Sequence, residues 1–124
     1  MEFGFEKLEV YQLAIEFVDR VFSVSSSFSL RVQSSLGDQF RRAAISIPNN
    51  IAEGSAKVSS REKRQFYNYA LNSTNECVPI ITIAKNQNEL TKPEHDYMRK
   101  TCGRIYMMLV KLIKSTDRQK TDNE

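Results

Sequence analysis

The sequence predicts an all-α fold, an up-down-up-down antiparallel four-helix bundle. Apolar residues recur at helical spacing in four separate stretches, and no strand-period alternation is long enough to compete with them. The connections between these stretches are short, which favours antiparallel neighbours. With 124 residues, of which 40% are hydrophobic and 27% charged, the chain is predicted to form a single domain (residues 1–124) with a modest core.

The four predicted helices cover about residues 5–25, 35–53, 60–88 and 92–115, and a polar tail over 116–124 follows. The tail is predicted to fray, because its residues turn polar after the last apolar stripe.

The predicted helix over 5–25 carries two neighbouring apolar stripes. They contain Leu8, Tyr11, Ile15, Val18 and Phe22, and Val10, Ala14, Phe17, Val21 and Val24. Together the stripes cover about half of the helix circumference, which is more than a surface helix of a small bundle needs. A monomer with deeper burial is one explanation. Four helices have little material to cover both stripes, so we favour self-association.

The predicted helix over 35–53 is expected to begin at Ser34 or Ser35, where a serine hydroxyl can accept from free amides of the first turn. It is expected to end at Gly54, which can adopt the left-handed conformation that terminates helices. Pro48 lies within it and cannot donate to the carbonyl of Ala44, so we predict a bend there unless the helix breaks.

A polar stripe also runs along this second helix. Its members are Gln39, Arg42, Ser46, Asn50 and Glu53. A polar helix face most often lies in water, but the spacing is that of a packing seam. If the chain self-associates, the stripe is better placed at a subunit contact or lining a central channel. The amides of Asn49 and Asn50 either satisfy backbone groups freed by Pro48 or reach a neighbouring chain.

The third predicted helix again has two apolar stripes, which predicts two contact faces. The stripes contain Phe66, Ala70, Ser73, Cys77, Ile80 and Ala84, and Tyr67, Leu71, Thr74, Val78 and Ile81. Ser59 with Glu62, and Thr91 with Glu94, match capping boxes at the starts of the third and fourth helices. Pro79 predicts a second kink.

Positive charge is concentrated near the C-terminus. The whole chain carries a formal net charge of +3, whereas residues 99–120 alone carry +6. Five cations fall on one side of the fourth predicted helix: Lys100, Arg104, Lys111, Lys114 and Arg118. Such a strip can neutralise backbone phosphates of RNA or DNA. A solvated cationic face is at least as compatible with the pattern.

Motifs for catalysis or cofactor binding are missing from the sequence. His95 has no partners at metal-ligand spacing, and no phosphate-binding glycine loop, nucleophile elbow or paired-cysteine motif occurs. Cys77 and Cys102 lie in apolar helical patterns and are interpreted as reduced core thiols. We therefore expect a non-enzymatic protein without cofactor or metal. The N-terminus lacks a signal-peptide pattern, and no stretch is apolar enough to span a membrane, so we expect a cytoplasmic protein without membrane contact.

Several segments, in order along the chain, resemble a known family. They are Leu8-Glu9-Val10-Tyr11-Gln12, Gln39-Phe40-Arg41-Arg42-Ala43-Ala44, Ser46-Ile47-Pro48 and Asn50-Ile51-Ala52-Glu53-Gly54. The family is that of the bacterial four-helix bundle proteins encoded in intervening sequences of 23S rRNA genes, and it includes the accessory variability determinant proteins of diversity-generating retroelements. The resemblance implies a homopentameric barrel. For the retroelement branch it also implies a basic surface that binds nucleic acid and a reverse transcriptase as partner.

Two functional hypotheses follow. In the first, the chain is an oligomeric accessory protein whose basic helix contacts phosphates, with Arg41 or Arg42 contributing if they are exposed. In the second, the oligomer is a protein-protein scaffold without nucleic-acid contact, in which these arginines pair with Glu53 or other carboxylates across subunits.

Overall fold

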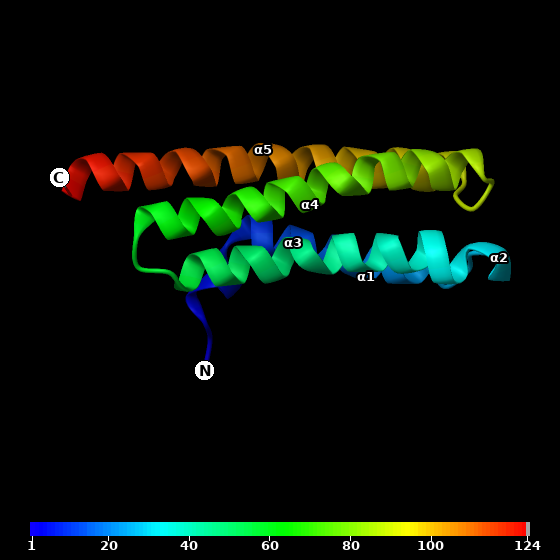
Figure 1. Cartoon of the computed structure of the whole chain (residues 1–124), viewed down its shortest axis with the longest axis horizontal. Helices are drawn as coiled ribbons and strands as arrows, with labels where there is room; N and C mark the ends of the chain where they lie inside the picture. The colour runs from blue at the N-terminus through cyan, green and yellow to red at the C-terminus, as the bar shows by residue number, and fades with distance from the viewer. Residues whose placement is uncertain (124) are drawn as a thin grey trace.

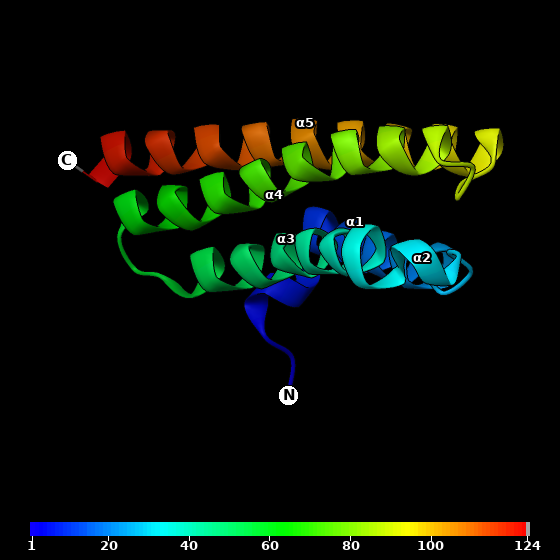
Figure 2. The same cartoon turned by 45° about the vertical axis from the view of Figure 1, so that its right-hand side comes forward.

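The fold is an all-helical bundle in two layers, seen in a computed structural model that describes the backbone of residues 1–123 and the side chains of residues 1–117. Its four long helices are α1 (Glu9–Ser25), α3 (Asp38–Ala56), α4 (Ser60–Asn86) and α5 (Lys92–Asn123). One layer holds α4 and α5, and the other holds α1 and α3 (Figures 1 and 2). Because α3 packs on α1 and α4, and α5 on α4 and α1, the four-helix bundle is confirmed.

The core lies between the layers and uses the predicted apolar stripes. Phe17 of α1 and Phe40 of α3 meet edge to face, with ring centroids 6.3 Å apart. Both stripes of α4 face neighbours within the chain, since Tyr67 and Ile81 are as fully buried as Cys77. On α1 only one of the two stripes is buried in this way.

The second predicted helix starts earlier than expected. Helical backbone begins in α2 (Leu30–Val32) and passes through the π-helical turn η2 (Gln33–Gly37) into α3. Ser34 and Ser35 therefore lie inside a helical segment, so the prediction that one of them caps it is wrong. A short 3-10 helix, η1 (Gly4–Lys7), precedes α1.

The π turn is stabilised by side chains that the sequence did not place together. The Gln33 amide donates to the Ser25 carbonyl at 2.7 Å. Arg41 donates to the Ser25 hydroxyl at 2.9 Å, to the Gln33 carbonyl at 3.2 Å and to Asp38 at 2.8 Å. A Cβ on Gly37 would lie 3.0 Å from the Arg41 guanidinium, so glycine leaves room for it. These bonds connect the end of α1 to the start of α3.

Gly54 does not terminate its helix. α3 continues to Ala56, and no glycine in the described chain has a positive φ. A Cβ at Gly54 would lie 2.6 Å from the Tyr67 ring, a distance that real Cβ atoms essentially never show. The predicted left-handed role is therefore wrong: glycine is needed here for close helix packing. Lys63 supplies the C-terminal cap, donating to the Ser55 carbonyl at 3.0 Å.

Both predicted N-cap residues cap their helices, but only Thr91 and Glu94 form a complete capping box. The Ser59 hydroxyl accepts from the Glu62 amide at 3.1 Å. Thr91 and Glu94 are reciprocal, with the Glu94 amide donating to the Thr91 hydroxyl at 3.2 Å and the Thr91 amide donating to the Glu94 carboxylate at 2.8 Å. The residues flanking α4 and α5 thus set where both helices begin.

The C-terminal end of α4 is closed by a left-handed residue. Asn88 has φ 61°, and its amide donates to the Lys85 carbonyl at 3.0 Å. The Glu89 amide reaches back to the Ala84 carbonyl at 2.8 Å. These two bonds form a Schellman motif, which ends the helix at Asn86. Neither Pro48 nor Pro79 breaks its helix.

The fourth helix ends later than the predicted residue 115, because α5 continues to Asn123. Thr116 is buried, and Asp117 forms an ion pair with Arg64 of α4 at 3.0 Å. These contacts extend α5 along α4 beyond the last apolar residue of its stripe.

Candidate functional site

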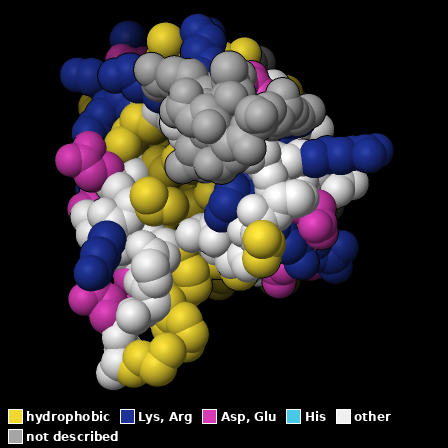
Figure 3. All heavy atoms as spheres, turned by 90° about the vertical axis from the view of Figure 1, so that its left-hand side faces the viewer, with side chains coloured by type: hydrophobic (Ala, Val, Ile, Leu, Met, Phe, Trp, Pro, Cys, Tyr) yellow, Lys and Arg dark blue, Asp and Glu magenta, His cyan; other side chains and the backbone are white. Residues whose placement is uncertain are grey.

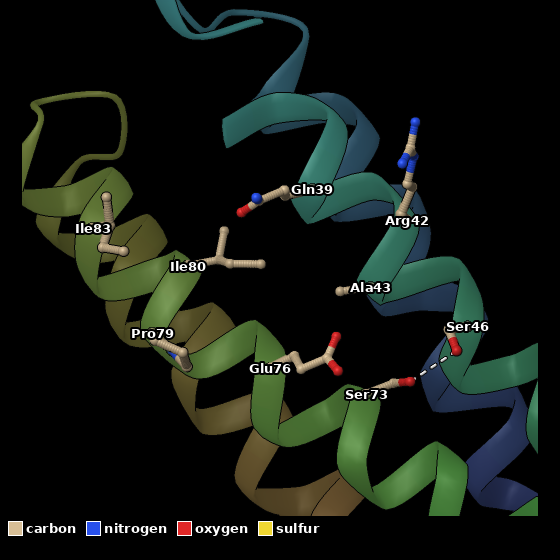
Figure 4. Close-up of a pocket in the computed structure, with 9 residues that line it drawn as sticks. All are labelled: Gln39, Arg42, Ala43, Ser46, Ser73, Glu76, Pro79, Ile80 and Ile83. Atoms are coloured by element: carbon tan, nitrogen blue, oxygen red, sulfur yellow. Dashed lines mark hydrogen bonds between the residues drawn. The ribbon is translucent and has the colours of Figure 1, made fainter. Parts of the chain in front are cut away.

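A groove between α3 and α4 brings part of the predicted polar stripe together (Figure 4). Its volume is about 620 Å³. It is lined by Gln39, Arg42, Ala43, Ser46, Ser73, Glu76, Pro79, Ile80 and Ile83, and we call it the α3/α4 groove. Of the five predicted interface residues, Gln39, Arg42 and Ser46 line it, whereas Asn50 and Glu53 do not.

A hydrogen-bond network at one end of the groove joins the two helices. The Ser73 hydroxyl donates to the Ser46 hydroxyl at 2.8 Å. The Asn50 amide donates to the same hydroxyl at 2.9 Å and to the Ser46 carbonyl at 2.8 Å. Within this chain, the Asn50 side-chain amide therefore donates to a backbone carbonyl. That carbonyl belongs to Ser46, and not to Ala44, whose hydrogen bond Pro48 removes.

The charges of the groove are not paired with each other. Arg42 is the one cation and Glu76 the one carboxylate among the lining residues. The Arg42 guanidinium points away from the carboxylate of Glu76, and no ion pair joins them within the described residues (Figure 4). Glu53 pairs instead with Lys57 at 3.7 Å, and its side chain is 59% exposed. The groove thus presents an uncompensated charge on each wall.

The two adjacent arginines of the motif have different environments. Arg41 is half-buried and bonded to the π turn, so its guanidinium is committed to the fold. Arg42 is exposed. Of the pair, only Arg42 is free to contact a partner.

The predicted cations of α5 form an exposed strip. Lys100, Arg104, Lys111 and Lys114 are all exposed, and we call these four the basic strip. None of them forms an ion pair with a carboxylate in the part of the chain whose side chains are described. The side chain of Arg118, the fifth predicted member, lies outside the described residues. Figure 3 views the bundle from the end at which α5 terminates, where several Lys and Arg side chains lie at the upper left and others lie on the opposite side.

The aromatic residue Tyr97, near the basic strip, has one face of its ring covered by a side chain of α1. Arg20 of α1 lies over the ring of Tyr97, 4.6 Å from its centroid. One face of this ring is therefore covered. Met107, which is 61% exposed, lies among the strip residues by helical spacing.

The remaining chemically reactive side chains are isolated or buried. His95 contacts Asp96 at 2.8 Å, and no group of three or more metal-ligating side chains occurs within the described residues. Cys77 and Cys102 are free and buried. Burial raises the pKa of the Cys102 thiol to about 12 and that of Cys77 still further above its ordinary value. No helix in the described part of the chain is long and apolar enough to cross a membrane.

One surface is not anticipated by the sequence analysis. The α4 wall of the groove includes Glu76 and Ile83, which belong to neither predicted stripe. Ile15, 37% exposed, and Phe22, 44% exposed, belong instead to the α1 stripe for which self-association was expected. The helical wheel could have placed Ile83 beside the stripe that includes Ile80, but only the packing of α3 on α4 makes a groove of them.

Comparisons with known proteins agree with this architecture. The sequence model of the family described as "23S rRNA-intervening sequence protein" matches residues 6–111. A crystal structure of a protein of unknown function from the S23 ribosomal protein family of Bacteroides thetaiotaomicron is similar, with a TM-score of 0.76. It is 20% identical in sequence, and the match covers 85% of this chain and 98% of that one. A search of curated proteins found no match. Because the family match spans most of its length, this chain belongs to the 23S rRNA-intervening sequence protein family.

Proposed function

We propose that this chain is a non-enzymatic accessory protein that assembles into a homo-oligomer and binds the backbone of RNA or DNA through α5. The observation that carries the proposal is the basic strip: four exposed cations on one side of one helix, none paired with a carboxylate within residues 1–117. Phosphate groups are the ligands that such a row neutralises, releasing counterions as they bind.

Backbone binding without base readout fits the surroundings of the strip. Tyr97 is stacked with Arg20, so one face of its ring is not free for a nucleobase. No other aromatic ring lies within the strip by helical spacing. An oligomer would repeat the row of cations on each subunit, and the contacts would add without sequence preference.

Fluorescence anisotropy with a labelled single-stranded RNA and a DNA duplex, across a series of salt concentrations, tests this function. Replacing Arg104 and Lys111 by alanine should weaken binding and reduce the salt slope by about 1 for each phosphate that is no longer neutralised. A matched control replaces Lys7 and Arg61, which are exposed cations outside the strip, and should retain most of the affinity. An equal decrease in affinity in both variants would point to general charge and overturn the assignment to α5.

The self-association part of the proposal is supported by the exposed apolar residues of α1, Ile15 and Phe22. A homopentamer, the state that the family resemblance implies, would have five times the 14.3 kDa mass of the chain in multi-angle light scattering. If the oligomer forms but binds no nucleic acid even at low salt, the chain is instead a protein-protein scaffold, a role for which the same apolar residues are the supporting observation.

A further inference from the structure

A second, smaller pocket lies between α4 and α5, with a volume of about 240 Å³. The α5 side of this pocket, which we call the α4/α5 pocket, is formed by Arg99, Cys102, Gly103 and Tyr106. These residues follow one another at three- and four-residue spacing and therefore lie on one side of α5. The basic strip lies roughly 120° further round the same helix. The pocket is thus a separate surface of α5.

Gly103 leaves the α4/α5 pocket open on the α5 side. It lies in the interior of α5, where glycine is less favourable than alanine because it loses more backbone entropy on folding. No neighbouring group lies within 4 Å of the position that its Cβ would take. In contrast to Gly54, therefore, no adjacent helix requires a glycine here. The missing side chain creates empty space beside Cys102 of the pocket lining.

The floor of the pocket is largely apolar, and one wall is an aromatic ring. Cys102 of α5 and Thr74 of α4 are each 1% exposed, and Val78 of α4 is half-buried. Tyr106 is 37% exposed, and a helical side chain leans over the turn that precedes it, which here contains Gly103. A planar ring seated over Gly103 would therefore contact the ring of Tyr106 on one side and the apolar floor on the other.

Charge in this pocket has a single sign. Arg99 is the one charged residue of the lining, and it forms no ion pair among the residues whose side chains are described. Burial raises the pKa of the Cys102 thiol to about 12, and the positive charge of Arg99 opposes this rise, so the guanidinium lies near the floor. Asn75 of α4 adds an exposed side-chain amide. Because the lining contains no carboxylate, in contrast to that of the α3/α4 groove, the pocket favours an anion.

We propose that the α4/α5 pocket binds a small aromatic carboxylate. The planar guanidinium of Arg99 matches the two oxygens of a carboxylate, and the ring of the ligand packs over Gly103 against Tyr106. Arg99 and Tyr106 are about 10 Å apart along the helix axis, a distance that one ring with its carboxylate and the hydrogen bonds to Arg99 can span. The volume is below that of sites for drug-sized ligands, which also favours a ligand with a single ring.

Saturation-transfer difference NMR with benzoate as the probe tests the proposal on the full chain. Wild-type protein should give a signal that saturates at millimolar benzoate. Arg99→Gln should weaken benzoate binding by about tenfold, because a charge-assisted pair of hydrogen bonds is lost. Gly103→Leu should abolish the signal, because its side chain fills the empty space without meeting a neighbouring group. Benzyl alcohol, which has the ring without the charge, should bind wild type and Arg99→Gln equally weakly.

Arg104→Gln is the matched control, because Arg104 is an exposed cation of α5 outside the pocket. This variant should keep the wild-type affinity for benzoate. Equal losses in Arg99→Gln and Arg104→Gln would point to general charge and overturn the proposal. Unchanged binding to Gly103→Leu, or a wild-type signal that does not saturate, would also overturn it. Circular dichroism checks the fold of each variant, and Arg99→Gln, at an exposed residue, tests the proposal even if Gly103→Leu is unfolded.

Discussion

α1 and α4 each carry two apolar stripes in the sequence, yet only α4 buries both within the chain. In α4 the second stripe includes Tyr67, Thr74 and Ile81, none more than 3% exposed. In α1 the corresponding stripe includes Ile15 and Phe22, at 37% and 44% exposed. A doubled stripe therefore predicts two contacts, without deciding whether the second contact lies within the chain or between chains.

The difference follows from position in the bundle. α4 has 27 residues and packs along both α3 and α5, so each of its stripes meets a helix. α1 has 17 residues and contacts α3 and α5 less extensively. The doubled stripes of both helices favoured self-association, and after folding only α1 still exposes apolar residues of its second stripe.

The largest expected effect concerns truncation of the two stripes. Ile81→Ala should lower the free energy of unfolding by about 2–5 kcal/mol, because the site is fully enclosed and a cavity remains. Ile15→Ala should cost about 1 kcal/mol or less, since its side chain is already partly in water. Urea unfolding at a protein concentration that keeps the chain monomeric measures both. An equal loss of unfolding free energy in the two variants would contradict the conclusion that α4 buries its second stripe and α1 does not.

A second test concerns how closely α4 approaches its neighbour. Gly54→Ala should lower the free energy of unfolding by about 1–3 kcal/mol, because the new methyl group meets the Tyr67 ring of α4.

Gly103→Ala is the matched control, since nothing lies within 4 Å of a Cβ there and the residue is helical. It should raise stability by about 0.5–1 kcal/mol by reducing backbone entropy in the unfolded chain. Thermal unfolding should show a lower Tm for Gly54→Ala and a higher Tm for Gly103→Ala, which would support the close packing of α3 on Tyr67 of α4. A neutral Gly54→Ala would show that the helices can separate at little cost.

The smallest expected effect concerns the turns that follow α1 and α4. The Glu89 carboxylate, after α4, accepts from the Ser29 amide at 2.5 Å and the Ser29 hydroxyl at 2.9 Å, and lies 3.9 Å from Arg31. The two hydrogen bonds, with a smaller contribution from Arg31, lower the pKa of Glu89.

A lowered folded-state pKa means that this stabilisation is complete above the unfolded pKa of about 4.3 and is lost as pH falls through the folded value. Glu89→Gln should therefore lower the Tm at pH 7 more than at pH 3. Ser29→Ala, which removes only the hydroxyl donor, should have an intermediate effect. A Glu89→Gln penalty that does not change with pH would contradict the assigned bonds.

Much of the local structure was predictable because it depends on neighbours in sequence. The N-caps at Ser59 and Thr91 pair with residues three positions later, so their pattern alone places two helix starts. The core stripe of α1 and the exposed cations of α5 follow from helical periodicity in the same way. Two local predictions failed. Ser34 and Ser35 lie inside the helical segment that they were expected to cap. Gly54 was expected to end its helix, but it is required for the close packing of Tyr67, a residue of another helix.

By itself, the sequence determined four amphipathic helices, their antiparallel order and a basic strip on the last one, since periodicity and short connections specify all three. Only the tertiary structure decided that Arg41 is committed to the π turn while Arg42 is exposed, and that the polar stripe splits between a groove and an exposed end. It also decided that both apolar stripes of α4 are buried within the chain, whereas one of the two stripes of α1 stays partly exposed. The physical reason is that burial is a property of two surfaces in contact, and a single helix encodes only one of them.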